Sequence, residues 1–157
     1  MRVGIEILQK QIGKILLEGK FQSFVFNSEV QSKINVTYLK FENWLHITTS
    51  DETAIQELKT KDIEQIQTWK DESQATFEYP ITNIETEFPE FKNLIGKKLL
   101  NYSELVTLSK NDITIGIQFF FENGLTFTQY SDIEDRQLYS FETEIPNNLR
   151  EKVLKIL

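Results

Sequence analysis

The sequence predicts an α+β protein made of two similar antiparallel β-meander halves that share one core. Short runs in which apolar and polar residues alternate recur along the chain, as is typical of half-buried strands. Only two alanines occur among the 157 residues, whereas isoleucine, phenylalanine and threonine are plentiful. This bias favours strands over long helices. Three short segments also recur in the same order in the two halves of the chain.

These recurring segments predict an internal duplication. In each half a Gly-Lys motif comes first, a Phe-Glu-Asn motif follows and a Ser-Asp pair comes last. The matching residues are 12–17 and 95–100, 41–45 and 121–125, and 50–51 and 131–132, at offsets of 83, 80 and 81. Small loop insertions account for the drift in the offset. We therefore expect a single domain over residues 1–157, in which pseudo-repeat halves of about 1–74 and 75–157 share one core.

A hairpin is predicted in the second half. Apolar residues alternate with others over 115–121 and again over 125–130, and Asn123-Gly124 lies between the two runs. Both turn residues tolerate the positive φ that tight hairpins require. The first half repeats the pattern over 34–41 and 44–48, but Trp44 stands where the second half has Gly124. Tryptophan fits positive φ poorly, so we expect another type of turn there.

Further strands are expected at the start of each half and near the half boundary. These extended segments are 14–17, 21–26, 75–81, 97–102, 105–108 and 137–145. Proline is tolerated in the first turn of a helix, so Pro89 predicts a short helix over 89–94.

Two longer helices are predicted to cover the sheets, near 52–70 and 147–157. The capping-box pattern Thr49-x-x-Glu52 precedes the first, whose apolar residues fall within an arc of roughly 140° at helical spacing. In an alternative interpretation, 53–58 is another strand and the helix begins near Lys61, with Asp62 as its N-cap. Pro146 precedes the second helix, for which Leu149, Val153 and Ile156 supply an apolar stripe.

Charge and composition limit the partners and cofactors. The net charge is −7, from 17 basic and 24 acidic residues, whereas nucleic acids and anionic membranes require a basic surface. We therefore expect neither as a partner. The acidic charge could attract a basic protein, but keeping a small protein soluble is the simpler role of such a charge. The chain has no cysteine, which removes disulfides and thiolate sites. No nucleotide, dinucleotide or metalloprotease motif occurs, so we expect no cofactor.

The expected location is the cytoplasm. Glu6, Lys10 and Lys14 interrupt the apolar stretch that a signal peptide would need. No apolar run approaches the roughly 18 residues of a membrane-spanning helix.

Trp44 and His46 form the first candidate binding site. Both alternate with Leu45 and Ile47, so they lie on the outer face of their strand if the two aliphatic residues face the core. His46 is the only histidine, which leaves it without a partner for a catalytic triad or a metal site. The alternative is an ordinary surface histidine beside a covered tryptophan.

Asp132, Glu134 and Asp135 form the second candidate, an acidic cluster after a strand, with Asp51 and Glu52 at the equivalent place in the first half. Such carboxylates could bind a basic partner or act as acid and base. Their spacing does not match a calcium-binding EF-hand, and we predict no metal site. The alternative is ordinary turn and helix-capping chemistry.

Phe120 is the third candidate, because the run of three phenylalanines over 119–121 must place at least one ring on each face of a strand. If both faces are covered, the run belongs to the core. If one face is open, Phe120 marks an interface.

These features favour a non-enzymatic protein-interaction module, with an acidic inhibitor of the immunity type, which would neutralise a basic toxin, as one specific form. One alternative is a small enzyme that uses Glu42, Glu122, Asp51 or Asp132 as acid and base. A second alternative is a carrier that holds a small ligand between the meanders under the 52–70 helix. The sequence does not specify the oligomeric state.

Overall fold

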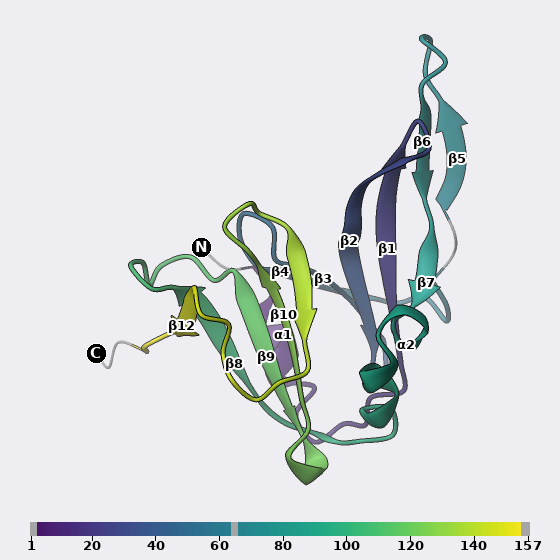
Figure 1. Cartoon of the computed structure of the whole chain (residues 1–157). Helices are drawn as coiled ribbons and strands as arrows, with labels where there is room; N and C mark the ends of the chain where they lie inside the picture. Colours follow the sequence, from purple (N-terminus) through teal and green to yellow (C-terminus); the bar gives the residue numbers. More distant parts are fainter. Residues whose placement is uncertain (1–2, 64–65, 155–157) are drawn as a thin grey trace.

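The computed structural model describes residues 3–63 and 66–154 of the chain (Figure 1). The protein is mostly β, with two antiparallel sheets and only short helices among the described residues. The predicted antiparallel sheets are therefore confirmed, whereas the predicted α+β class is corrected to mostly β, because the described helices are short. None of the described helices is long and apolar enough to cross a membrane.

The first sheet contains seven strands, six of which follow the hydrogen-bonded order β4-β3-β2-β1-β6-β5, while β7 also pairs with β1. Its strands are β1 (Glu18–Phe26), β2 (Glu29–Lys40), β3 (Trp44–Thr48), β4 (Ala54–Leu58), β5 (Ile66–Lys70), β6 (Thr76–Tyr79) and β7 (Ile81–Asn83). Both β6 and β7 pair with β1, and only Pro80 separates them. Proline cannot donate a ladder hydrogen bond, so it divides what is otherwise one strand.

The second sheet contains five strands in the order β11-β10-β9-β8-β12. They are β8 (Leu99–Thr107), β9 (Gly116–Phe121), β10 (Thr126–Ser131), β11 (Gln137–Ser140) and β12 (Leu149–Glu151). The predicted hairpin is confirmed as β9–β10, whose turn holds Asn123 at φ 65° and Gly124 at φ 70°. In the first sheet, Trp44 lies in extended β3 opposite Lys40, so the turn there differs as expected.

The helix predicted near 52–70 is wrong: the structure has β4 and β5 there, with residues 64 and 65 outside the described part. The alternative strand over 53–58 is close to β4. Two features oppose a helix start. Asp51 adopts a left-handed φ of 60°, and the Thr49 N–H, which a capping box would pair with the Glu52 side chain, donates to Gln137. Ile55 then pairs with Ile47 of β3 and is buried in the core.

The helix predicted near 147–157 is also wrong over its described residues. Leu149 to Glu151 form β12 against the edge of β8, and 152–154 are not helical. The available backbone groups of β8 and the burial of Leu149 account for the strand. The described helices are α1 (Ile5–Gln9), α2 (Ile84–Glu87) and the 3-10 helices η1 (Pro89–Asn93) and η2 (Glu122–Gly124); η1 confirms the short helix predicted over 89–94.

The core consists of apolar side chains from both halves of the chain. Phe21 of β1 lies edge-on to Phe88, at 6.0 Å between ring centroids, and to Tyr139 of β11, at 6.4 Å. Phe127 of β10 stacks on Phe119 and lies edge-on to Phe91. Aromatic rings from both sheets therefore pack together between the sheets. Such ring pairs stabilise a core by more than the apolar area that they bury.

Buried polar side chains of the second sheet also bond to the backbone of the first. The Gln137 amide donates to the carbonyls of Ile34 and Asn35, and its oxygen accepts the Thr49 N–H at 2.8 Å. The Ser131 hydroxyl donates to the Thr49 carbonyl at 2.7 Å. These bonds fix how β10 and β11 sit against β2 and β3, since buried polar groups are costly when left unpaired.

Candidate functional site

Trp44 and His46 lie on the outer face of the first sheet, opposite the fully buried Leu45 and Ile47, as the alternation predicts. Trp44 is itself completely buried. The ammonium groups of Lys20 and Lys40 lie 5.6 and 5.5 Å from the centroid of its ring, and Ile63 of the β4–β5 connection packs against the buried cluster of Val36, Tyr38 and Trp44. The Trp44 ring is therefore covered by lysine side chains and by a connection that sequence periodicity did not place there.

His46 is half-buried, and its ring lies edge-on to that of Tyr38, at 5.6 Å between centroids. Burial lowers the pKa of the imidazole below its ordinary value, because the charged form is poorly solvated there. The side chain therefore stays neutral at physiological pH. The binding role predicted for Trp44 and His46 remains a prediction.

The acidic cluster predicted from the sequence forms the turn between β10 and β11. The Asp132 carboxylate accepts the backbone N–H groups of Glu134 and Arg136, both at 2.9 Å, and two contacts of 2.8 Å join it to the Arg136 guanidinium. Burial alone would raise the pKa of Asp132, but these hydrogen bonds and the arginine charge outweigh it and hold the pKa below its ordinary value. Asp132 thus organises the turn.

The structure joins this turn to the loop between β3 and β4. The Asp135 carboxylate accepts the backbone N–H of Asp51 at 2.9 Å, and Asp135 adopts a left-handed φ of 58°. Glu134 points into solvent with 66% of its side chain exposed, 3.3 Å from Arg136. Two acidic loops that are distant in the sequence therefore contact each other.

A polar hollow of about 410 Å³ lies beside this turn. Its lining comes from β10, β11 and the segment that follows β11: Tyr130, Ser140, Glu142, Glu144, Ile145, Pro146, Asn147 and Asn148. Burial raises the pKa of the Tyr130 phenol, and the nearby negative charge of Asp132 raises it further. Tyr130 thus lines the hollow and lies two residues before Asp132 of the acidic turn.

We call Asp132, Glu134, Asp135, Glu142 and Glu144 the acidic face. Residues 131–148 contain these five carboxylates and one basic residue, Arg136, which gives the segment a net charge of −4 out of −7 for the whole chain. Glu142 and Glu144 are exposed, and no ion pair holds either of them within the part of the chain that the structure describes. Sequence reasoning missed these two glutamates, although a count of charge along the chain would have found them.

The carboxylates considered as catalytic acid and base form contacts with other residues, in different turns of the structure. Glu42 forms an ion pair with Lys14 at 3.0 Å, and Glu122 accepts the backbone N–H of Lys98 at 2.9 Å. Each lies in its own hairpin turn, whereas Asp132 is held by Arg136. Among residues 3–63 and 66–154, no group of three His, Asp or Glu side chains could hold a metal ion.

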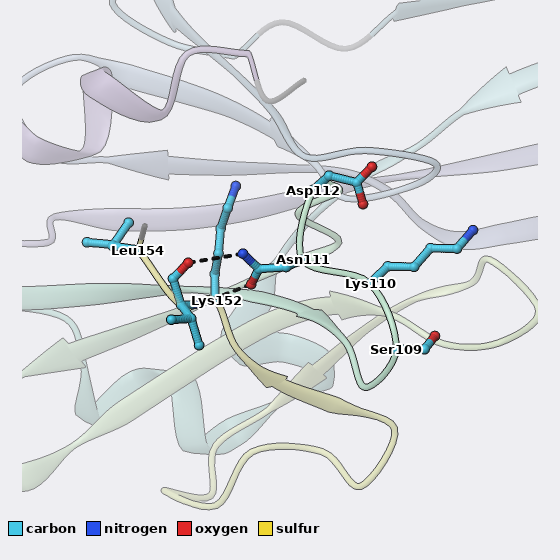
Figure 2. A pocket seen from close by; sticks show the side chains of 7 residues that line it. Ser109, Lys110, Asn111, Asp112, Lys152 and Leu154 are labelled. Carbon is cyan, nitrogen blue, oxygen red and sulfur yellow. Dashed lines mark hydrogen bonds between the residues drawn. The ribbon is translucent and has the colours of Figure 1, made fainter. Parts of the chain in front are cut away.

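Figure 2 shows a second hollow, of about 620 Å³, between the β8–β9 connection and the chain after β12. Both ends of the Asn111 amide bond to the Val153 backbone, at 3.0 and 3.1 Å. The ammonium of Lys152 lies 3.7 Å from the buried Glu104 carboxylate. Asn111 and Lys152 are therefore engaged in contacts that join the chain after β12 to β8 and to the β8–β9 connection.

Phe120 lies half-buried on the outer face of the second sheet, between the buried Phe119 and Phe121. The segment after β11 crosses this face, because Gln118 donates to the Thr143 carbonyl at 2.9 Å and Thr126 donates to the Phe141 carbonyl at 3.3 Å. Residues 137–145, expected to be one strand, therefore leave the sheet after Ser140. An interface role for Phe120 remains a prediction.

When compared with models of known protein families, with curated proteins and with solved structures, the chain matches none of them.

Proposed function

We propose that the chain is a non-enzymatic protein-binding module that recognises a basic protein through the acidic face. The observation that carries the proposal is the concentration of charge, with a net −4 in residues 131–148, of which Glu142 and Glu144 line the hollow. A field of one sign steers an oppositely charged partner and speeds its association. An inhibitor of the immunity type, acting in the cytoplasm on a basic toxin such as a nuclease, is the specific form that we favour.

The carboxylates of the acidic face are of two kinds. Asp132 accepts hydrogen bonds within its own turn, and Asp135 accepts the Asp51 N–H of the loop after β3, so both charges are fixed in place before a partner arrives. Glu142 and Glu144 are exposed beside the polar hollow and remain available to a lysine or arginine of the partner. Fixed charges lower the ordering cost of binding, which favours recognition of a basic surface.

Charge reversal at Glu142 and Glu144 tests this proposal on a partner isolated from the native host. We expect the Glu142→Lys, Glu144→Lys variant to slow association about tenfold at low salt, and to differ little from the wild type at high salt. Stopped-flow association kinetics at both salt concentrations measure the effect.

The matched control reverses Glu6 and Glu90, which are exposed on α1 and η1 and lie outside the acidic face. It changes the net charge of the chain by the same amount. Equal slowing by both variants would show that only the net charge of the chain affects association. That result would overturn the assignment of the binding site to the acidic face.

We also propose that the two halves of the domain arose by duplication. Both sheets contain a four-stranded meander with the same neighbours in the same order, β4-β3-β2-β1 and β11-β10-β9-β8. In each half a segment after the meander leads to a strand on the far side of its first strand, β6 in one sheet and β12 in the other. Random association of strands would not favour the same path twice.

Reciprocal backbone bonds between the repeated Gly-Lys segments support the same proposal. Gly13 donates to the Leu99 carbonyl at 2.7 Å, and Gly96 donates to the Leu16 carbonyl at 2.8 Å. The two glycines have left-handed φ values of 88° and 87°. Each bond maps onto the other by the sequence offset of 83, as two-fold related copies would require.

Alanine substitution at Gly13 and at Gly96 tests this equivalence. A built Cβ meets nothing within 4 Å at either position, so the cost comes from the left-handed φ alone. Each substitution should lower the free energy of unfolding by about 1 kcal/mol, by similar amounts. A large loss at one position and none at the other, measured by urea unfolding, would contradict the equivalence.

A further inference from the structure

The two Gly-Lys segments, residues 12–17 and 95–100, pair with each other in an antiparallel ribbon, which we call the Gly-Lys ribbon. Ile15 and Lys98 lie directly opposite each other in it, between flanking backbone hydrogen bonds. The first segment leads into β1 and the second into β8, so the ribbon connects the two sheets. In Figure 1 both segments run below the sheets.

One face of the Gly-Lys ribbon is buried and the other is open. Leu16 and Leu99 belong to the core and are completely buried. Side chains alternate between the faces of an extended ribbon, so Ile15, Leu17 and Leu100 lie on the opposite face. They are 45%, 47% and 52% exposed. The ribbon therefore presents an exposed aliphatic stripe, a kind of surface that marks interaction sites when it is contiguous.

The aliphatic stripe lies among lysines. Residues 10–17 and 92–100 contain five lysines and no carboxylate, in a chain whose net charge is −7. Glu42 and Glu122 of the two hairpin turns contact the ribbon and bring the charge of this region to a net +3. Glu18, which follows the ribbon, forms an ion pair with a lysine of β2. Charge therefore selects an acidic occupant for the aliphatic stripe.

The turn between β10 and β11, residues 132–136, has the complementary character. Ile133 lies in the middle of this acidic turn and is 89% exposed, with carboxylates on both sides of it in the sequence. The loop that bonds to the turn adds Asp51 and Glu52, which gives the two loops together a net charge of −4. An exposed aliphatic side chain among carboxylates thus matches an exposed aliphatic stripe among lysines.

A single copy of the chain cannot bring these two surfaces together. The Lys98 N–H donates to Glu122 in the turn before β10, whereas the acidic turn follows β10. The length of β10, about 20 Å for a strand of this size, therefore separates them. We propose that the acidic turn of one copy docks on the Gly-Lys ribbon of a second copy, with Ile133 packed on the aliphatic stripe. Each copy keeps one free turn and one free ribbon, so this head-to-tail association is open-ended.

The contact is local and sensitive to salt. The net charge of −7 opposes association, but salt screens charges that lie more than about 8 Å apart at physiological ionic strength. The regions in contact carry +3 and −4, so their attraction acts at short range. The docked turn belongs to the acidic face, so a basic partner must displace the second copy. This consequence rests on the proposed function, whereas the contact itself does not.

Sedimentation velocity of the purified chain tests the contact without any partner. We expect the average mass to rise with protein concentration at low salt and to return toward that of the monomer at high salt. The ribbon variant, Ile15→Ser, Lys98→Glu, and the turn variant, Ile133→Ser, Glu134→Lys, should each weaken self-association about tenfold or more. A wild type that stays monomeric at every concentration would overturn the inference.

Matched controls make the same kinds of change at exposed positions elsewhere. Leu108→Ser, Lys110→Glu is the control for the ribbon variant, and Val30→Ser, Glu29→Lys is the control for the turn variant. Leu108 is 61% exposed and Val30 is 64% exposed. Both controls should associate as the wild type does. A ribbon or turn variant that associates as strongly as its control would contradict the proposed contact.

A mixture of the ribbon variant and the turn variant identifies the contact most sharply. The ribbon variant retains its turn and the turn variant retains its ribbon, so the mixture should form a one-to-one complex that grows no further. A ribbon-to-ribbon or turn-to-turn contact would give no such complex, and that result would overturn the inference. The proposed function fails separately, if the Glu142→Lys, Glu144→Lys variant associates with a basic partner as fast as the wild type does.

Discussion

Replacing Phe127 with alanine should lower the free energy of unfolding by about 3 to 5 kcal/mol. The side chain is completely buried in β10. Its ring centroid lies 5.0 Å from that of Tyr139, 5.4 Å from that of Phe91 and 5.6 Å from that of Phe141. Truncation therefore removes apolar burial and several aromatic contacts, and it leaves a cavity that the surrounding rings cannot fill without moving.

Urea unfolding of the wild type and the variant measures this loss. Phe120→Ala is the matched control, because Phe120 is half-buried on the outer face of the neighbouring strand. We expect the control to lose clearly less stability than Phe127→Ala. Equal losses would show that the aromatic rings between the sheets contribute no more to the free energy of unfolding than a ring on the outer face.

Replacing Gln137 with leucine should cost about 2 to 4 kcal/mol, although leucine is similar in size. The Gln137 side chain is buried and bonds to the backbone of Thr49, Ile34 and Asn35, and it accepts a hydrogen bond from Gln129 at 3.0 Å. Leucine can make none of these bonds. Buried donors and acceptors of the first sheet would then lose their partner at the junction with the second.

The control for this prediction is Gln31→Leu, at an exposed position of β2. Exposed substitutions of this kind usually change stability by no more than about 0.5 kcal/mol. Unfolding curves for both variants should therefore separate clearly. If Gln137→Leu were as stable as the control, the hydrogen bonds of Gln137 between the sheets would contribute nothing to the free energy of unfolding.

The alternation of apolar and polar residues predicted strands well where it is regular on both sides of a recognisable tight turn. The β9–β10 hairpin follows from alternation around Asn123-Gly124, whose positive φ values are local properties. The helix predicted near 52–70 failed because its apolar residues fit helical spacing and also fit short strands. Ile55 pairs with Ile47 of the preceding β3 and Trp69 pairs with Phe77 of the following β6, and helical spacing alone does not exclude these pairings.

The candidate site was also predicted only in part, because some of its residues are brought together by the path of the chain. The acidic turn at Asp132, Glu134 and Asp135 is continuous in sequence, so it could be found directly. The contribution of Glu142 and Glu144 depends on the path of the chain after β11, which was expected to continue as a strand. Burial of Trp44 depends on lysines from β1 and β2, and it could not be read from β3 alone.

Affinity capture from the native host tests the central claim most directly. The tagged chain, the Glu142→Lys, Glu144→Lys variant and the Glu6→Lys, Glu90→Lys control would each be washed at low and at high salt, and bound proteins identified by mass spectrometry. We predict that the wild type and the control retain one basic protein in stoichiometric amount at low salt, that high salt releases it, and that the acidic-face variant fails to retain it. No basic protein on the wild type at either salt concentration, or equal retention by the acidic-face variant, would contradict the proposed function.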